Sequence, residues 1–529
     1  MNSKKFLNLI SKKTLYFFYF FLFSYAIFYA FRLGITSDAG FYIEVGKNRL
    51  DYLLSFGFVK EKSHIYQQAF PAIYLTVAAF VSSFFPQSMD LQIFYIFNFA
   101  TSLVGALGVY KLSKYLFNEK IAIYTFVFLL LYAPFFGHMH INGRDTSLLA
   151  CNIWITYFSL KYFDFDILKN KKYVIYLSII VAIGVGIRLH FVATLIPLIL
   201  FLSYNLFQVP KKFKIFFFID FLKIILFSSF IVFVFWSHLH SDFFSRIKEM
   251  YLYHSNVLWG WPYAALNGEF FESTNYPFTY IFEYLFYKTP EYVIFLYICF
   301  FIFLRSVINK IKSEIPQFNK KIFFILFNIF YPTMLLFIFD IKIYDGIRLF
   351  LYLIPYFLFI PAITFYYLIH NLSKILNKLT LVTCSVLFFY YIYSFSILTP
   401  YQYIYANSFA GKFSSLNDKF ENDYWGVSLK ELMGKIKFSE ELNKKKQIKF
   451  TVCGPPAAAV KYNLNNLTSS INYKIVRPEE SPDYVILTNR TLKSLNKDVI
   501  HTCFKEYNGK NIVEVKRRNL VISAIKEMN

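Results

Sequence analysis

The chain has 529 residues, of which 57% are hydrophobic and 16% are charged, and its formal net charge is +23. Apolar runs of about eighteen residues or more recur along it, the length that a helix needs to cross a bilayer core. These patterns exclude a soluble globular protein and indicate a polytopic membrane protein. Most lysines lie in short loops between the runs, so the charge indicates cytoplasmic loops and contact with membrane lipids, with no nucleic-acid partner.

The first apolar run is predicted to be a retained span, because it is too long for a signal peptide and no small-residue cleavage site follows it. Four lysines within the first thirteen residues place the N-terminus in the cytoplasm. The next run, 69–85, is short and bordered by little charge. If it crossed the membrane, every lysine-rich loop would lie outside, so we predict a helix at the outer surface. Outer-leaflet helices are therefore expected around 39–85.

The remaining runs complete a bundle of about eleven spans whose lysine-rich loops all face the cytoplasm. The predicted spans lie near 14–34, 90–110, 121–137, 147–163, 173–187, 191–208, 224–238, 290–308, 322–339, 349–369 and 380–398. The fold class is thus mainly α, and residues 1–398 form the membrane domain.

Residues 399–529 are more polar and contain short β-branched runs, such as DYVILTNR, beside helical segments. Such runs are typical of strands, so we predict a small α/β domain. The parity of the spans places it outside the cytoplasm. Cys453 and Cys503 lie within it; an extracytoplasmic location allows a disulfide between them, but their spacing leaves the pairing open. Three other cysteines lie in apolar runs and are expected to be buried.

Polar residues gather on the predicted outer face, which is informative because charges at membrane depth are costly. Each of them has a plainer explanation as a solvated anchor beside a span. Together, however, several separate loops bring acids and arginines to one face, and this pattern predicts a shared cavity. The candidate residues are Asp38, Glu44, Arg144, Asp145, Arg188, His190, Trp259, Asp345 and Arg348.

The residue types in this set suit one kind of chemistry. The guanidinium group of arginine presents a fixed fork of donors that matches a phosphate. A carboxylate can take a proton from an attacking hydroxyl group. We therefore expect a site for a phosphorylated substrate in which a carboxylate acts as a base.

His138 and His140 alternate in the sequence HMH and are weak candidates for metal ligands. Zinc would need a third ligand from elsewhere, and no other histidine or cysteine nearby has ligand spacing. We favour hydrogen-bonding roles for both. No cofactor is identified from the sequence, and a divalent metal stays open as an alternative.

Three features together resemble the polytopic C-type glycosyltransferase (GT-C) fold. They are the Asp after the first span, the Arg-Asp pair between the third and fourth spans, and the late motif YDGIRLFLYLIP (344–355). This superfamily includes protein O-mannosyltransferases and the aminoarabinose transferase that modifies lipid A. The stretches PYQYIYANSFAG (400–411) and ENDYWGVSLKE (421–431) are more similar to bacterial members of the dolichyl-phosphate-mannose-protein mannosyltransferase-like group.

The resemblance implies an inverting transferase that takes a sugar from a polyprenyl-phosphate donor on the outer side of a bacterial inner membrane. The acceptor would be a glycan, a lipid or a protein. Asp38 matches the general base of the family, and Asp145 matches its second outer-loop acid, which predicts a catalytic role for both. Arg348 matches its phosphate-holding residue. Many relatives have two adjacent acids in the first loop, whereas this chain has Ala39 after Asp38. We therefore predict a transferase that uses a lipid-linked sugar, and we do not extend the prediction to a protein mannosyltransferase.

Three alternatives stay open at this stage. A flippase or transporter would also be polytopic, but would be expected to show similar halves and charges near mid-membrane. A polysaccharide polymerase or ligase would share the outer arginines, but not an Asp directly after the first span. A non-catalytic member of the same fold would explain the loss of the second acid.

Overall fold

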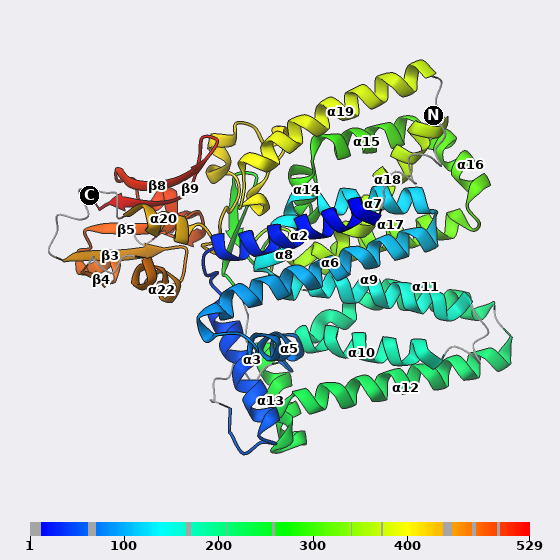
Figure 1. Cartoon of the computed structure of the whole chain (residues 1–529), viewed down its shortest axis with the longest axis horizontal. Helices are drawn as coiled ribbons and strands as arrows, with labels where there is room; N and C mark the ends of the chain where they lie inside the picture. Colours follow the sequence, from blue (N-terminus) through cyan, green and yellow to red (C-terminus); the bar gives the residue numbers. More distant parts are fainter. Residues whose placement is uncertain are drawn as a thin grey trace.

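The structure is a computed structural model, and it describes residues 12–61, 70–164, 171–208, 210–256, 260–339, 341–371, 374–436, 447–467, 472–494 and 498–528. The chain forms a helical bundle with a small strand-containing domain at one end (Figure 1). The bundle helices are α2 (Lys12–Arg32), α6 (Asp90–Leu116), α7 (Glu119–Leu130), α8 (Ala133–Ile141), α9 (Gly143–Asp164), α10 (Lys171–Ile187), α11 (Ile196–Phe207), α12 (Lys211–Phe235), α14 (Tyr280–Lys288), α15 (Glu291–Ile302), α16 (Leu304–Glu314), α17 (Phe318–Ile338), α18 (Ile354–Asn371) and α19 (Lys374–Ile397).

These apolar helices make the chain an integral membrane protein. Within the described residues, six helices are long and apolar enough to cross a membrane, and up to eight spans result if two bent pairs each count as one. The predicted number of about eleven is therefore not confirmed. The buried share of the apolar stretch ranges from 78% in the helix ending with α18 to 6% in α12. This contrast identifies α18 as a core helix and α12 as a peripheral one.

One predicted straight span, 121–137, is broken in the structure, and a second break lies where the predicted span 290–308 begins. The helices α7 and α8 meet at a bend of 64°, with Pro134 in the first turn of α8. The helices α14 and α15 are bent by 114° around Pro290. Proline lacks the amide that a continuing helix needs, which accounts for a new helix starting at each point. Both breaks lie at the end of the bundle next to the small domain (Figure 1).

The helix α12 begins earlier than the predicted span at 224. Lys211 and Lys214, predicted as part of a loop, lie in its first turn. Lysine side chains at a helix end can extend to the membrane surface while their carbon chains stay in apolar surroundings. A lysine-rich stretch is therefore compatible with a helix that starts within it.

Three helices lie across the direction of the bundle at the end next to the small domain. These are α3 (Ala39–Leu54), α5 (Ile73–Ser82) and α13 (Phe243–Asn256), and Figure 1 shows α5 nearly end-on. The helices α3 and α5 touch at Gly46, where a Cβ would lie 2.3 Å from the carbonyl oxygen of Leu75. Helices are thus present within 39–85, and their position at the membrane surface stays a prediction.

The core of the bundle is formed where α6 packs on α9. A Cβ at Gly105 would lie 3.0 Å from the Ala150 side chain, and one at Gly108 would lie 2.8 Å from Trp154. Small residues let membrane helices approach closely without a hydrophobic driving force. Short 3-10 helices connect the longer elements: η1 (Gln87–Met89), η3 (Leu189–Leu195), η4 (Ser237–His240), η5 (Arg348–Leu353), η6 (Gln402–Ile404), η7 (Ser408–Ala410), η8 (Phe413–Asp418) and η9 (Pro478–Glu480).

The small domain follows α19 and contains a mixed five-stranded sheet in the order β4-β3-β5-β9-β8. The strand β3 is parallel to β4 and β5, whereas β9 is antiparallel to β5 and β8. Its elements are α20 (Leu429–Ile436), β3 (Ile448–Cys453), α22 (Ala457–Leu467), β4 (Tyr473–Ile475), β5 (Tyr484–Thr488), β6 (Thr491–Lys493), β7 (Ile500–Thr502), α23 (Cys503–Glu506), β8 (Asn511–Arg517) and β9 (Leu520–Glu527).

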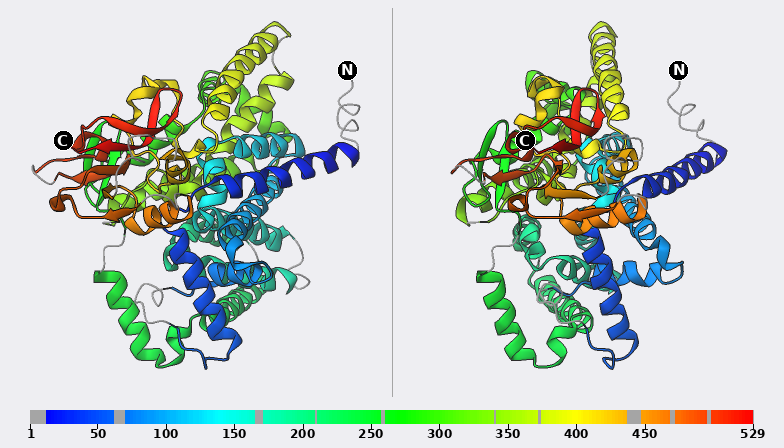
Figure 2. Two further views of the ribbon diagram at one scale, coloured as in Figure 1. Left: turned by 60° about the vertical axis from the view of Figure 1, so that its left-hand side comes forward. Right: turned by 90° about the vertical axis from the view of Figure 1, so that its left-hand side faces the viewer.

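A hairpin from the bundle reaches this domain. The strands β1 (Tyr263–Leu266) and β2 (Glu269–Glu272) pair with each other, and β1 contacts β6. Figure 2 shows the sheet lying against the helix ends instead of projecting from them. Cys453 and Cys503 form a disulfide with a Cα–Cα distance of 5.8 Å, which settles the pairing that the sequence left open. The other three cysteines are buried, as predicted.

Candidate active site

A cavity of about 790 Å³ lies between the bundle and the small domain. We call it the charged cavity. Its wall is built from the start of α3, the start of α9, the end of α10, the turn before η5 and the loop after β3. The lining residues are Ser37, Asp38, Phe41, Tyr42, Phe70, Arg144, Ile187, Arg188, Leu189, His190, Gly260, Trp261, Tyr344, Asp345, Arg348, Trp425, Val452, Gly454, Pro455, Pro456 and Arg490.

Asp38 directly precedes α3 and is half-buried at the cavity wall. Its Oδ2 accepts a hydrogen bond of 3.1 Å from the Tyr42 hydroxyl, one turn later on the same helix. Burial, and then the charge of Asp38, raise the pKa of Tyr42 to about 12, so its hydroxyl keeps its proton. Within the described residues Asp38 forms no ion pair, which leaves Oδ1 available to a ligand.

Arg144 approaches the same tyrosine from α9. Its Nη1 donates to the Tyr42 hydroxyl at 3.1 Å, and its Nη2 donates to the Ile187 carbonyl at 2.8 Å. Its guanidinium group also lies 5.1 Å from the ring centre of Tyr42 and 4.7 Å from that of Phe70. Tyr42 thus accepts from Arg144 and donates to Asp38, and this fixes the direction of both hydrogen bonds.

A continuous series of ion pairs crosses the cavity wall. Asp145 accepts from Arg188 at 2.7 Å and from Arg348 at 3.5 Å. Asp345 pairs with Arg348 through one oxygen and with Arg490 through the other, each at 2.8 Å. The bundle and the small domain are therefore joined by alternating charges. Asp145 is buried and is not among the lining residues, so the arginines stand between it and the cavity.

The turn that carries Asp345 has an unusual backbone. Asp345 and Gly346 both have positive φ, 57° and 64°. Asp tolerates this left-handed region better than most side chains do, and Gly is the residue best suited to it. The turn directs Asp345 between Arg348 and Arg490 and starts η5 at Arg348.

The site has an excess of positive charge. Four arginines surround three aspartates: Arg144, Arg188, Arg348 and Arg490 against Asp38, Asp145 and Asp345. Among the described residues, the Nε of each of these arginines is buried without a hydrogen-bond partner. An unpaired buried donor is costly, so the site is suited to an anion that would bring further acceptors.

Aromatic rings hold two of the guanidinium groups. Arg348 lies 4.9 Å from the ring centre of Tyr344 and 5.0 Å from that of Trp425, and Arg490 lies 4.0 Å from that of Trp261. Such contacts restrict the arginine side chains while leaving their N–H edges free to bind.

The structure brings most of the predicted site residues together. Six of them line the charged cavity, and Asp145 lies directly behind it: Asp38, Arg144, Arg188, His190, Asp345 and Arg348. Glu44 lies on the exposed side of α3 and is not among the lining residues. Trp259 lies outside the described residues.

Both histidines of the HMH sequence in α8 are buried, and each has its own partners. The ring nitrogens of His138 face the Pro134 carbonyl at 2.5 Å and the Tyr424 hydroxyl at 2.7 Å. His140 stacks on Phe99 with ring centres 4.5 Å apart. No group of three potential metal ligands occurs in the part of the chain that the structure describes. Within these residues His138 and His140 are thus not part of a metal-ligand group, and we assign no step to a metal.

Sequence reasoning missed three residues of the site: Tyr42, Trp425 and Arg490. Tyr42 follows Asp38 by one helical turn, and that spacing could have found it. Trp425 lies in the DYWG stretch that the sequence singled out for its resemblance alone. Arg490 is the second residue after a fully buried strand of the small domain, where a charge signals a specific partner.

A second cavity of about 720 Å³ lies between α9, α10, α11 and α12. We call it the apolar cavity, because Asp220 is the one charged residue among those that line it. Along α12 its lining extends from Phe217 to Phe233, about 24 Å at 1.5 Å per residue. Phe70 and Leu189 line the charged cavity and pack against the cluster of Trp236, Leu239 and Met250, in which Trp236 and Leu239 line the apolar cavity. The two cavities therefore border a common cluster of side chains.

We compared the structure with known ones. Two crystal structures of ArnT from Cupriavidus metallidurans match it over nearly the whole of both chains. The apo form has a TM-score of 0.51 at 9% identity and covers 97% of this chain and 98% of its own. The form bound to undecaprenyl phosphate has a TM-score of 0.50 at 9% identity, covering 99% and 98%. The chain has the fold of ArnT. The GT-C fold predicted from the sequence is thereby confirmed.

Other comparisons are more limited. A family model described as dolichyl-phosphate-mannose-protein mannosyltransferase matches residues 71–236, which include Arg144, Asp145 and Arg188. The oligosaccharyltransferase of Archaeoglobus fulgidus in its apo form has a TM-score of 0.44 at 11% identity, covering 88% of this chain and 69% of its own. The search of curated proteins found no significant match.

Proposed function

We propose that this protein is an inverting glycosyltransferase that moves a sugar from a polyprenyl-phosphate donor to an acceptor in the charged cavity. One observation carries the proposal: the Asp38 carboxylate and four guanidinium groups share a single cavity. The ArnT fold supports this class of donor, since one ArnT structure holds undecaprenyl phosphate. A polyprenyl-phosphate sugar carries one negative charge, which the excess charge of the site can balance.

Arg348 and Arg188 are assigned to the phosphate of the donor. Both line the cavity, both are held by Asp145 from behind, and both have an Nε without a partner within the described residues. When the bond between the sugar and the phosphate breaks, a second negative charge develops on the leaving phosphate. Fixed guanidinium groups that face this charge stabilise the transition state more than the bound donor.

Asp38 is assigned to proton transfer. The acceptor oxygen or nitrogen attacks the anomeric carbon and loses its proton to Asp38, while the bond from that carbon to the phosphate oxygen breaks. The products are the glycosylated acceptor and polyprenyl phosphate. The negative charge thus passes from Asp38 to the phosphate. Tyr42 holds one carboxylate oxygen and directs the other toward the acceptor.

Asp145 and Asp345 are assigned to positioning the arginines. The sequence predicted a catalytic role for Asp145, and its place behind Arg188 and Arg348 supports a role through them. His190 is exposed at the cavity wall, and we assign it, with Arg144, to the acceptor side. Trp261, Trp425 and Tyr344 offer ring faces on which a sugar can stack.

The apolar cavity is assigned to the polyprenyl tail. It follows α12 for much of the thickness of a bilayer core, and it shares with the charged cavity the side-chain cluster around Trp236. With the tail there, the phosphate would lie at the charged end. The small domain then lies outside the cytoplasm of a bacterial inner membrane, with the N-terminus inside.

The test uses the purified full chain in lipid nanodiscs, supplied with undecaprenyl phosphate carrying labelled mannose, glucose, aminoarabinose or galacturonic acid. We expect release of undecaprenyl phosphate from one of these donors when an outer-envelope extract supplies the acceptor. The Asp38→Asn variant provides the matched blank. Loss of label from no donor at all would reject the proposed function.

A further inference from the structure

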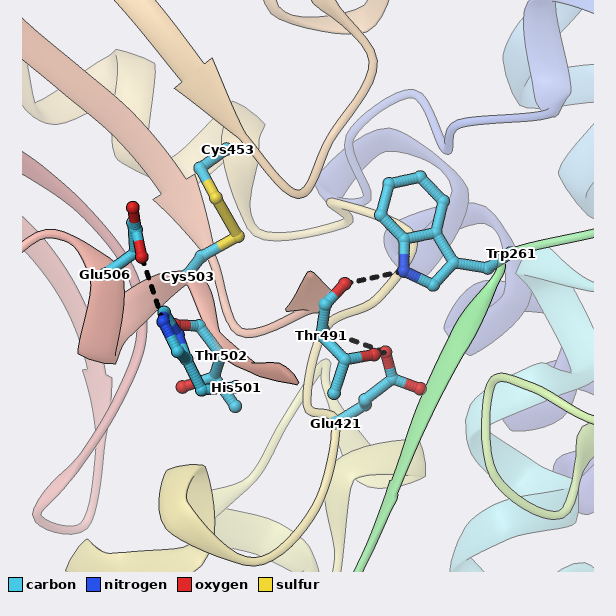
Figure 3. The surroundings of a disulfide bond; sticks show 8 residues. All are labelled: Trp261, Glu421, Cys453, Thr491, His501, Thr502, Cys503 and Glu506. Atoms are coloured by element: carbon cyan, nitrogen blue, oxygen red, sulfur yellow. Dashed lines mark hydrogen bonds and ion pairs between the residues drawn. A yellow bond between two sulfur atoms is a disulfide. The ribbon is translucent and has the colours of Figure 1, made fainter. Parts of the chain in front are cut away.

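The small domain holds a disulfide close to the charged cavity (Figure 3). Cys453 ends β3, and the next three residues, Gly454, Pro455 and Pro456, line the cavity. Cys503 begins α23, directly after β7, and its backbone N–H donates to the Arg490 carbonyl at 2.9 Å. The disulfide therefore ties together two segments that border the cavity.

The segment around Arg490 is fixed on several sides. The Trp261 Nε1 donates to the Thr491 carbonyl at 2.7 Å, and the Glu421 carboxylate accepts from the Thr491 hydroxyl at 2.5 Å and from its backbone at 3.0 Å (Figure 3). Gly454, with φ of +99°, packs so closely that a Cβ would lie 2.6 Å from the Thr488 hydroxyl. These contacts hold the backbone next to Arg490 from several sides.

The side chain of Arg490 connects this backbone segment to the charged residues of the cavity. Its Nη1 donates to the Tyr424 carbonyl at 2.7 Å, and its Nη2 pairs with Asp345 at 2.8 Å. The other oxygen of Asp345 pairs with Arg348, also at 2.8 Å. Asp345 lies in a left-handed turn with φ of 57°, a conformation that its partners must hold.

We infer that the Cys453–Cys503 disulfide and Arg490 form a positioning device for Arg348, so that affinity for the anionic donor depends on the disulfide. Arg490 is a positioning residue, since it acts on the phosphate through Asp345 and Arg348. The inference rests on the proposed function. A disulfide that only stabilised the small domain would change its melting temperature and leave donor affinity unaltered.

The first experiment measures binding of undecaprenyl phosphate to the full chain in nanodiscs by native mass spectrometry, before and after reduction with dithiothreitol. We expect reduction to weaken binding about tenfold, the size of one charge-assisted hydrogen bond. The Cys453→Ser/Cys503→Ser double variant should bind like the reduced protein and show no response to dithiothreitol. The Cys384→Ser variant, which removes a buried free cysteine, should respond like the unaltered chain.

The second experiment follows turnover in the oxidised chain. Arg490→Gln should raise the KM for the donor about tenfold and change kcat less than twofold, and Arg490→Lys should recover part of the loss. Arg477→Gln, at an exposed arginine of the same domain, is the matched control. In the double cysteine variant Arg490→Gln should add little, because both changes act on one series of contacts.

Unchanged undecaprenyl phosphate binding after reduction would overturn the inference, even with a lower melting temperature. So would full additivity of Arg490→Gln and the cysteine changes. A failure of the proposed function would look different: the unaltered, oxidised chain would then release undecaprenyl phosphate from none of the sugar donors. The reduction experiment needs no variant, so it stays decisive if a substitution prevents folding.

Discussion

The two cavities of this protein are similar in volume, about 790 and 720 Å³, and opposite in chemistry. The charged cavity is bordered by helix ends, turns and the small domain, whereas the apolar cavity is bordered mainly by the bodies of helices. The free-energy cost of placing arginine and aspartate side chains is tolerated only where ionic partners and water can reach them. The position of a cavity along the bundle therefore decides its chemistry, and a lipid-linked sugar has the same division between an anionic head and an apolar tail.

The largest effect is expected at the base. Asp38→Asn should lower kcat by about 10²–10⁴-fold, the usual contribution of a general base. Undecaprenyl phosphate binding should persist, because the arginines remain. Turnover assays and binding in nanodiscs check the two parts. Asp51→Asn, at an exposed position on the same helix, is the control. Normal turnover by the Asp38→Asn variant would remove Asp38 from the mechanism.

The next largest effect is expected at Arg348, which we assign to the phosphate of the donor. Arg348→Gln should raise the KM for the donor about 10–100-fold, because a charge-assisted contact to phosphate is lost. It also leaves Asp345 and Asp145 short of a partner, which should cost about 3–5 kcal/mol of stability. Kinetics and thermal unfolding separate the two consequences. Arg305→Gln, at an exposed arginine of α16, should change neither; an unaltered KM for Arg348→Gln would contradict the assignment.

A smaller effect is expected in the apolar cavity, where it tests whether the donor tail lies apart from the donor phosphate. Ser229 lines the apolar cavity. Ser229→Trp should raise the KM for a donor with an undecaprenyl tail by roughly threefold to tenfold, since the indole occupies about one tail segment. A donor with a ten-carbon tail should be unaffected. Ser385→Trp, on peripheral α19, should affect neither donor. Equal losses with both tails would place the tail elsewhere.

The smallest effect is expected from pH, at a buried carboxyl group next to the ion pairs of the charged cavity. Burial, and then the charge of Asp345, raise the pKa of Glu421 from its ordinary 4.5 to about 7. A carboxyl group that holds its proton more tightly when folded loses stability on ionising, so the melting temperature should fall as pH rises from 4.5 to 7. Glu421→Gln should reduce that slope, whereas exposed Glu479→Gln should not. Identical slopes in all three proteins would reject the role of Glu421.

Charge and hydropathy predicted much of this site because they are properties of segments. Asp38, Arg144, Arg188, Asp345 and Arg348 could each be placed at one membrane face from the parity of the spans, and the structure brings them to one cavity. The side of the helix that a residue occupies was harder to predict. Glu44 is only six residues from Asp38, yet it lies on the exposed side of α3.

Long-range contacts could not be predicted in this way. Arg490 meets Asp345 across 145 residues, and no local pattern marks that pair. The helix break at Pro134 was also missed, because the run 121–137 was predicted from its apolar length alone. Hydropathy also predicted both α12 and α18 as spans, whereas the structure places α12 at the periphery of the bundle and α18 in its core. In a bilayer, lipid and protein core are equally apolar, so hydropathy cannot separate them.

The ion pair between Arg490 and Asp345 has a consequence for exchanging parts between proteins of this fold. Each residue belongs to a different structural unit, and each would keep a buried charge if the other were replaced. A small domain transplanted from a relative would therefore need its own counterpart of Arg490, or the turn at 344–348 would have to travel with it. A chimera should therefore keep a matched pair at positions 345 and 490, and a junction placed directly after α19 does not ensure this.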